Sequence, residues 1–353
     1  MDRNPDLQIR SAIHHSPVHS QEVFPITKNP IHQLLTSVGV FTSASGITFY
    51  QAGRLGERYE KVSFVAESQH NLVHSDIVTE KGSVFEARRQ FEGREFLAST
   101  DSWFRPVNFY IGPDGALYVI DYYRQFIEHP EWMDEQTMEQ YDIYAGRDRG
   151  RIYRITPRGE SGAEWLNRLN LSAATATELV QTLEHENIWW RRHAQRLLVD
   201  RQDPGAVEPL EELVLNSESA LARLHALWTL DGLDALEAGL IRAGLEDEEA
   251  GVRENAIKLA ELYADQDPSL VADLQQLEKD PSERVRYQLL LTLGEFDNPR
   301  IQQMRQRMLF AHIEDRWFQI AALSAPSARG MNMLEESIGE LASRPSEGRR
   351  AYF

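Results

Sequence analysis

The sequence of 353 residues contains no cysteine. This absence excludes disulfide bonds, thiolate metal sites, a cysteine nucleophile and a Cys-x-x-Cys-His haem attachment within the chain. It does not indicate the cellular compartment.

Basic residues are also scarce, with 37 Lys and Arg against 55 Asp and Glu, for a formal net charge of -18. A nucleic-acid surface needs basic stripes that neutralise phosphates, so this balance argues against a nucleic-acid partner. Most of the excess negative charge lies after Glu160. We interpret it as the solvated acidic surface of a helical region.

Long hydrophobic runs are missing as well, and no apolar stretch approaches the length of a membrane span. The first residues, Met1-Asp-Arg-Asn-Pro5, lack the apolar segment of a secretory signal peptide. We therefore expect no transmembrane segment and no signal peptide in this sequence. If the protein is exported, the export information lies outside the sequence.

Residues 1–40 have few periodic apolar positions and are rich in His, Pro and Ser, which predicts an irregular N-terminal segment. Four histidines occur in it: His14, His15, His19 and His32. Their spacing matches no standard ligand pattern, so we expect no metal site here.

A β-sheet unit is predicted around Gly112-Pro-Asp-Gly115, which has the composition of a tight turn. Apolar residues alternate over 107–111 before the turn, and residues 117–120 form a β-rich return strand. Residues 152–155 supply a third strand.

A similar unit precedes it, with strands predicted at 46–50, 62–66 and 71–77, and with further strand-like segments at 84–88 and 94–97. A recurring unit of about four strands is typical of β-propeller blades. Because two blades do not close a ring, we expect the chain to be the tail end of a longer protein.

An insertion interrupts the second unit between Asp121 and Gly150. It is rich in Tyr, Trp, His, Arg and Asp, which are residue types that bind polar ligands. Pro130, followed by Glu131, Asp134 and Glu135, predicts a short helix with acidic residues at its start.

After Pro157 the apolar period becomes helical and a motif recurs every 30 to 33 residues. The positions aligned in this register are Arg192, Arg223, Arg253, Arg286 and Trp317. This regularity predicts an α-solenoid of HEAT-like repeats over residues 158–345. We interpret the arginines as anchors that pair with acidic residues and carbonyls, and a row of ligand contacts is the alternative.

The fold class predicted is thus a multidomain β + α protein: a partial propeller of about two blades over residues 41–157, followed by the solenoid. With these motifs laid out, the chain resembles the membrane-bound dehydrogenases of the Planctomycetes type. In that family, a six-bladed propeller similar to quinoprotein glucose/sorbosone dehydrogenases precedes HEAT repeats and often a cytochrome c domain. The segments that carry the likeness are Phe41–Tyr50, His70–Asp76, Gly93–Asp101, Trp103–Val107, Gly112–Val119 and Gly150–Arg154.

The resemblance implies the C-terminal part of a quinoprotein-type sugar or alcohol dehydrogenase, inactive as an isolated chain and located in the periplasm or cell envelope. It implies pyrroloquinoline quinone as cofactor, and a cytochrome domain or another protein on the HEAT face as partner. The family places its catalytic histidine and calcium loop in earlier blades, which this sequence lacks, so calcium binding stays open.

Arg105 matches an arginine that holds the quinone carboxylates in the family, since a guanidinium can grip a carboxylate bidentately. Two departures weaken this site: the neighbourhood of Gln69 and His70 replaces a lysine, and Trp103 replaces a companion of the arginine. We assign Tyr123 and Arg124 to the same cofactor site, because propellers usually build sites in the loop after such a strand.

The candidate catalytic residues are His70, His74 and Asp121. A histidine beside an aspartate could act as general base on an alcohol, with hydride passing to the quinone. The alternative is that both histidines satisfy hydrogen bonds at blade junctions and that Arg105 clamps backbone carbonyls. A second function therefore stays open: a non-catalytic module that binds a protein or a polysaccharide.

Overall fold

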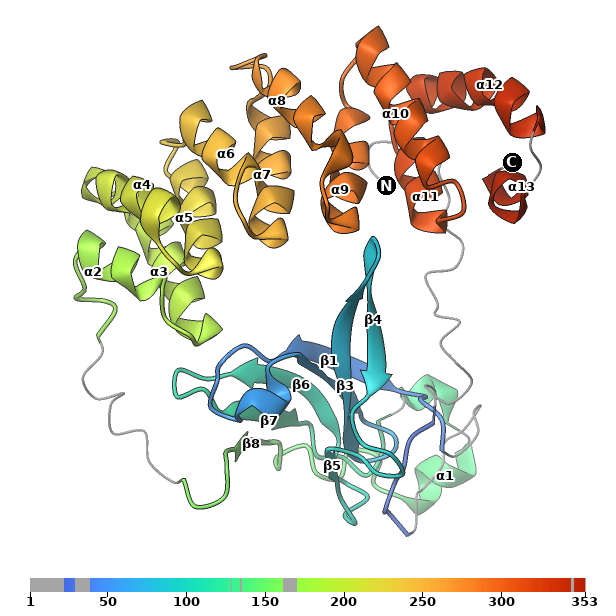
Figure 1. Ribbon diagram of the computed structural model, residues 1–353. Coiled ribbons are helices and arrows are strands. Elements are labelled where there is room, and N and C mark those ends of the chain that lie inside the picture. Colours follow the sequence, from blue (N-terminus) through green and yellow to red (C-terminus); the bar gives the residue numbers. More distant parts are fainter. Residues whose placement is uncertain are drawn as a thin grey trace.

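The computed structural model describes residues 22–28, 39–127, 129–133, 135–160, 170–343 and 346–352. The histidines at positions 14, 15, 19 and 32 lie outside these residues. An arc of paired helices stands over two β-sheets (Figure 1). The last strand ends at Ile155 and the first helix of the arc begins at Ala176, which confirms the predicted change from strands to helices near Pro157.

The first sheet is an antiparallel meander in the order β1-β2-β3-β4, and β5 pairs with β3. Its strands are β1 (Ala44–Phe49), β2 (Val62–Glu67), β3 (Leu72–Lys81), β4 (Val84–Arg89) and β5 (Leu97–Ala98). Asn71 turns the chain between β2 and β3 with a φ of 57°, a left-handed conformation that asparagine tolerates better than most residues.

The second sheet is antiparallel in the order β6-β7-β8, with β6 at Pro106–Ile111, β7 at Leu117–Asp121 and β8 at Arg151–Ile155. The predicted turn joins β6 to β7. Gly115 adopts a φ of +75° there, which a residue with a Cβ would adopt only with strain. The predicted short helix is also present, as α1 (Glu135–Gln140), after the 3-10 turn Pro130–Trp132.

The two sheets pack face to face around aromatic side chains, with the rings of Phe64 and Phe109 6.4 Å apart. Strand β1 lies close to β6. At Gly46 the approach is so close that an added Cβ would come within 2.8 Å of the Asn108 Cα. The antiparallel order agrees with the predicted blade-like units.

The helices form a two-layer array. The inner helices, nearer the sheets in Figure 1, are α3, α5, α7, α9 and α11, and each contacts the next. The bounds are α2 (Ala176–Thr182), α3 (Ile188–Arg201), α4 (Val207–Asn216), α5 (Ala220–Gly232), α6 (Ala238–Leu245), α7 (Ala250–Tyr263), α8 (Leu270–Gln276), α9 (Glu283–Leu293), α10 (Pro299–Ala311), α11 (Arg316–Leu323), α12 (Ser327–Ser343) and α13 (Glu347–Tyr352).

An arginine anchors each of the first four inner helices, four residues after the N-cap. It donates through Nη1 to the backbone carbonyl six residues earlier. The pairs are Arg191 with His185, Arg223 with Ser217, Arg253 with Asp247 and Arg286 with Asp280. In α11, Gln319 takes this role by donating to the Ile313 carbonyl. The anchoring interpretation is confirmed, because these bonds satisfy carbonyls in the turn before each helix.

The predicted register was wrong at its two ends. The buried anchor of the first repeat is Arg191, whose side chain is 1% exposed, whereas Arg192 points to solvent. At the other end Gln319 is buried and Trp317 is 42% exposed. Adjacent arginines are equivalent in a sequence pattern, and only the packed helix decides which one lies inside.

Two of the anchors also pair with an aspartate of the following repeat. Arg223 binds Asp247 at 2.7 and 2.8 Å, and Arg253 binds Asp280 at 2.8 and 2.9 Å. The equivalent position for Arg191 is Ser217, which lies six residues before Arg223. Nε and Nη2 of Arg191 have no hydrogen-bond partner within the described part of the chain, and burial lowers the pKa of Arg191 to about 10.

We therefore predict that Ser217→Asp stabilises the protein. A carboxylate at this position would pair with the buried Arg191 guanidinium, and a charge-assisted hydrogen bond is worth about 1.5–3 kcal/mol. Urea unfolding should show a higher free energy of unfolding. The same substitution in an Arg191→Met background should give no gain; an equal gain in both backgrounds would contradict the pairing.

Among the described residues, the sheets and the helical array meet at two places. At the first, the N-cap of α3 docks on the turn between β6 and β7: Asn187 Nδ2 donates to the Gly112 carbonyl at 3.0 Å, and Trp190 Nε1 donates to the Pro113 carbonyl at 2.8 Å. Ile188 adds its side chain to the core of the sheets. The predicted turn thus also serves as the attachment point of the helical array.

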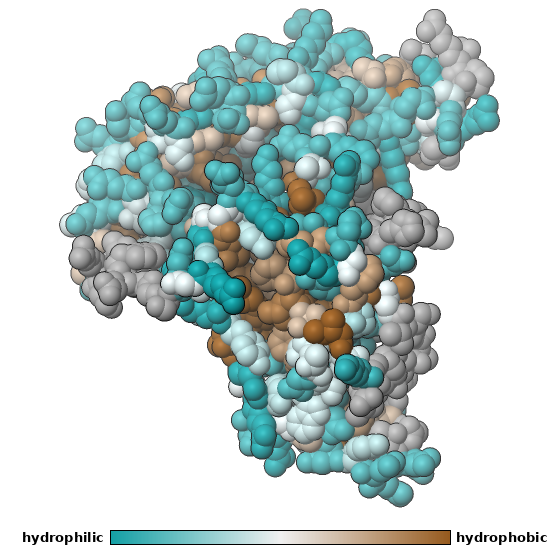
Figure 2. All heavy atoms as spheres, turned by 60° about the horizontal axis from the view of Figure 1, so that its bottom comes forward, coloured by the Kyte–Doolittle hydropathy of each residue, from teal (hydrophilic) through white to brown (hydrophobic). Residues whose placement is uncertain are grey.

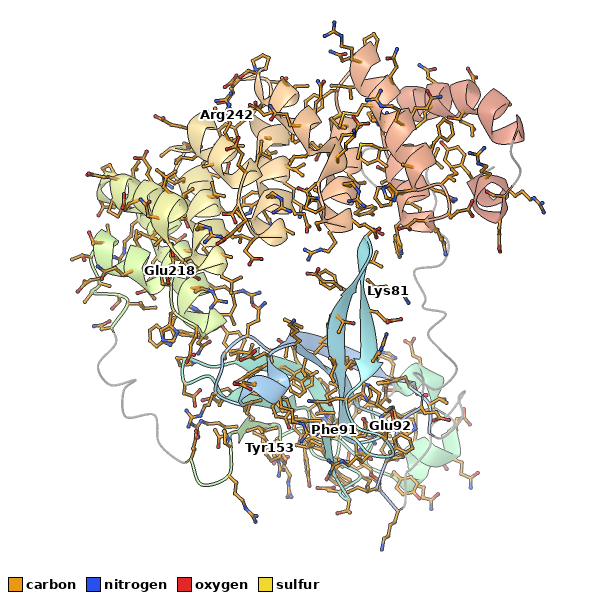
Figure 3. The ribbon with its side chains drawn as sticks, viewed as in Figure 1. Lys81, Phe91, Glu92, Tyr153, Glu218 and Arg242 are labelled. Atoms are coloured by element: carbon orange, nitrogen blue, oxygen red, sulfur yellow. The ribbon has the colours of Figure 1, made fainter. Side chains whose placement is uncertain are left out.

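The second contact is made by the hairpin of β3 and β4, which extends toward α9 and α11 (Figure 1). Figure 3 labels Lys81 at this end of the hairpin. Ser83 Oγ donates to Asp315 Oδ2 at 2.9 Å, and Arg284 donates to Glu80 Oε1 at 2.6 Å. The Arg284 guanidinium also lies 4.5 Å from the centre of the Phe85 ring. These contacts hold the arc over the sheets at its far end.

Candidate functional site

Four of the six predicted site residues meet at the end of the second sheet, and a fifth lies in the adjoining turn. Arg105 directly precedes β6, Asp121 is the last residue of β7, and Tyr123 and Arg124 follow it. His70 lies in the turn between β2 and β3, which Arg105 contacts through the neighbouring carbonyls. We call these five residues the junction cluster.

Arg105 is the centre of the junction cluster and is 3% exposed. Its Nη1 donates to the carbonyls of Ser68 and Gln69 at 3.0 and 3.3 Å. Its Nε donates to the Arg124 carbonyl at 3.0 Å and its Nη2 to the Gln125 carbonyl at 2.7 Å. Burial lowers the pKa of Arg105 to about 10.

All three guanidinium nitrogens of Arg105 thus donate to backbone carbonyls that no strand pairing satisfies. The side chain ties the first sheet to the segment that leaves the second, which is the clamp role of the alternative interpretation. A quinone carboxylate would have to displace these carbonyls to bind Arg105. Arg105 therefore does not fit the cofactor-holding role taken from the resemblance.

Asp121 also organises the backbone. Its Oδ1 accepts hydrogen bonds from the N–H groups of Arg105 at 2.8 Å and Tyr123 at 2.9 Å. The side chain is 1% exposed, and burial raises the pKa of its carboxyl group. Tyr123 has a φ of 49°, an uncommon conformation for a bulky residue, which the bond to Asp121 helps to hold.

His70 is 3% exposed and uses both ring nitrogens within the protein. The Gly39 N–H donates to Nε2 at 3.2 Å, so Nδ1 carries the proton that points to Glu67 Oε1 at 3.1 Å. Glu67 in turn accepts the N–H of Ser43. His70 therefore links the segment before β1 to the β2–β3 turn, as a satisfied neutral imidazole.

His74 lies apart from the junction cluster, between two carboxylates. Its Nδ1 is 2.7 Å from Glu95 Oε2 and its Nε2 is 2.9 Å from Asp76 Oδ1. Burial by itself lowers the pKa of His74, but the hydrogen bonds to Asp76 and Glu95 outweigh it and the pKa is raised. An imidazolium that donates on both sides has no free nitrogen to accept a proton from a substrate. This geometry supports the structural interpretation rather than a general base.

We predict a pH-dependent contribution of His74 to stability. Because its pKa is raised in the folded state, its contribution is complete below the unfolded pKa of about 6.5 and is lost as the pH rises through the folded value. His74→Gln should lower the free energy of unfolding by about 1–2 kcal/mol at pH 6, because the partly exposed Asp76 loses its cation while the buried Glu95 keeps its pair with Arg89. The difference between wild type and variant should shrink at pH 9.

Urea unfolding at several pH values from 5.5 to about 9 tests this, since that range spans the ordinary histidine pKa. Equal differences at both ends would show that His74 is neutral in the folded protein.

A second candidate surface lies on the inner helices, where sequence reasoning placed no site residue. Large side chains recur at the second position after the N-cap: Trp189 in α3, Leu221 in α5 and Trp317 in α11. Leu221 is 45% exposed. Two turns further along α5, Trp228 is half-buried and donates to Asn255 Oδ1 at 3.1 Å.

One cation, Arg192, accompanies these side chains. Arg192 occupies the α3 position equivalent to Leu224 in α5, and it is exposed with no side-chain partner within the part of the chain that is described. We call Trp189, Arg192, Leu221, Leu224 and Trp228 the inner-face surface. Counting residues from the N-cap of each inner helix would have identified the inner-face surface. The sequence alone does not give the N-caps, because they are assigned only once the helix starts are known.

Two further observations concern metal binding and membrane insertion. Within the described ranges, no group of three or more histidine, aspartate and glutamate side chains is arranged to hold a metal ion. None of the helices in those ranges combines the length and apolar character needed to cross a bilayer.

Comparison with known proteins gives one family match. A family model described as a domain of unknown function (DUF7133) matches residues 1–159, which include both sheets. No curated protein matches the chain.

Solved structures match about half of the chain at low similarity. One is a designed armadillo repeat protein in complex with the peptide (KR)4, with 18% identity, a TM-score of 0.32, and coverage of 51% of this chain and 96% of that one. A second designed armadillo repeat protein has 18% identity, a TM-score of 0.29, and coverage of 50% and 96%. An engineered protein has 14% identity, a TM-score of 0.30, and coverage of 51% and 95%.

Proposed function

We propose that this chain is a non-catalytic protein-binding module in which the inner-face surface holds a segment of a partner protein. The observation that carries the proposal is the exposure of Leu221, which occupies in α5 the position of Trp189 in α3 and lies two turns before Trp228. A leucine that is 45% exposed on a helix layer that also carries tryptophans is a suitable anchor point for an apolar side chain of a ligand.

The charge of this surface specifies the partner further. The chain as a whole carries -18, yet the inner-face surface presents the unpaired Arg192, and Arg196 lies one turn beyond it. An acidic segment with an apolar anchor would be attracted to this surface and repelled by the rest of the protein. Stacked helix pairs form extended surfaces of this kind, which suit an extended peptide.

The dehydrogenase hypothesis draws less support from the geometry. Its proposed base His74 faces two carboxylates, His70 is satisfied on both nitrogens, and Arg105 donates to backbone carbonyls. Each group serves the fold, and none is left for a substrate or a quinone. A binding function makes no such demand on these residues.

The proposal that the two sheets are blades of a larger propeller rests on the outer face of the first sheet. Ile47 of β1 is 67% exposed and Phe49 of the same strand is 39% exposed. Figure 2 shows apolar side chains gathered in the middle of the face it presents, between hydrophilic regions. Neighbouring sheets in a ring would cover such residues, since radial repetition is how propellers protect their sheets.

Binding to the inner-face surface can be tested with labelled peptides. We expect an acidic peptide that contains leucine to bind more tightly than a lysine-rich peptide of the same length. Leu221→Ser should weaken binding about tenfold, equivalent to about 1.4 kcal/mol. The matched control is Leu215→Ser on α4, where the leucine is 57% exposed but belongs to the outer layer.

Fluorescence anisotropy measures these affinities. Equal effects of the two leucine variants, or no preference for the acidic peptide, would count against this surface.

A dye-reduction assay tests the alternative directly. With added pyrroloquinoline quinone and calcium, and with aldoses or alcohols as substrates, we expect no reduction by this chain. Turnover that depends on Arg105 would overturn the non-catalytic proposal, because it would require the clamp to open for a quinone.

A further inference from the structure

The insertion between β7 and β8 forms a cavity of about 330 Å³ at the end of β7. Its apolar wall includes Ile120 and Ile152, which face the same side of neighbouring strands. Three arginines also line it: Arg124, Arg147 and Arg151. We call this cavity the arginine pocket.

Two of these guanidinium groups are held in place by aromatic rings and backbone carbonyls. Arg124 stacks on Tyr122 at 4.5 Å and donates to the Gly146 carbonyl, which ties the insertion to the end of β7. Arg151 stacks on Tyr123 at 3.7 Å, and its Nε donates to the Arg149 carbonyl at 3.1 Å. Their planes are thus oriented before any ligand arrives, which lowers the entropy lost on binding.

The third arginine has no such role in the fold. Arg147 is exposed, and its guanidinium has no hydrogen bond, ion pair or ring contact with any residue that the structure describes. The carboxylate nearest the pocket is Asp121, which also lines it but directs Oδ1 to two backbone N–H groups. The pocket therefore carries a local excess of positive charge in a protein with a net charge of -18.

We infer that the arginine pocket binds a compact carboxylated sugar, a uronic acid of one or two rings. A guanidinium fork matches a carboxylate bidentately, and Arg147 is free to form this pair. The isoleucine wall can receive the C–H face of a sugar ring. A volume of about 330 Å³ lies at the small end of ligand pockets, which suits one or two rings.

This site is separate from the inner-face surface, and it shares no residue with it. Loss of peptide binding would leave the arginine pocket unaffected, and failure to bind a uronic acid would leave the peptide proposal unaffected.

Isothermal titration calorimetry of the full chain with digalacturonate tests the inference. Neutral digalactose and inorganic sulfate serve as comparison ligands. We expect saturable binding of digalacturonate, weakened at least about tenfold by Arg147→Ala, or about 1.4 kcal/mol. Arg147→Lys should give an intermediate affinity, because lysine keeps the charge but loses the fork.

Arg300→Ala is the matched control, since Arg300 in α10 is also an exposed arginine without a side-chain partner among the described residues. It should leave digalacturonate binding unchanged. Circular dichroism should show that Arg147→Ala keeps the fold, because its guanidinium has no hydrogen bond, ion pair or ring contact with the described residues. Absence of digalacturonate binding, tighter binding of sulfate than of digalacturonate, or equal losses in the Arg147 and Arg300 variants would each overturn the inference.

Discussion

Buried guanidinium groups that donate to backbone carbonyls are the interaction on which both halves of this protein depend. Arg105 satisfies four carbonyls between the two sheets, and an arginine in the first turn of each of four inner helices satisfies a carbonyl in the turn that precedes the helix. Turns leave carbonyls without a regular partner, and burying them unpaired would be costly. One arginine can reach several carbonyls at once because its five donors form a rigid fork.

The same turns also join the two halves. The turn between β6 and β7 receives the N-cap of α3 through Asn187 and the indole of Trp190. The first inner helix is fixed there, and α9 is fixed by the β3–β4 hairpin. Leu221 of α5, on a helix between these two attachments, is 45% exposed.

Polar side chains that are fully hydrogen-bonded within the protein are structural candidates, whereas polar side chains without a partner are functional candidates. His70, His74 and Arg105 have the residue types of a catalytic site, but their polar atoms are bonded within the protein. Arg147 belongs to no recognised motif and Arg192 was aligned with the helix anchors, and the guanidinium groups of both have no partner in the described chain. Burying a charged group without a partner is expensive, so free cations remain where solvent or a ligand can reach them.

The sequence by itself determined the order of the elements: two groups of short antiparallel strands, the Gly112–Gly115 turn, a short helix in the insertion, and helix pairs repeating every 30 to 33 residues. These features depend on local periodicity and turn chemistry, which are readable along the chain. Only the tertiary structure decided that Arg191 rather than Arg192 lies inside, that His74 sits between Asp76 and Glu95, and that Arg105 clamps carbonyls instead of facing a cavity. The reason is physical: a polar side chain takes its role from the partners around it, and for Arg105 those partners lie up to 37 residues away and meet only when the two sheets pack together.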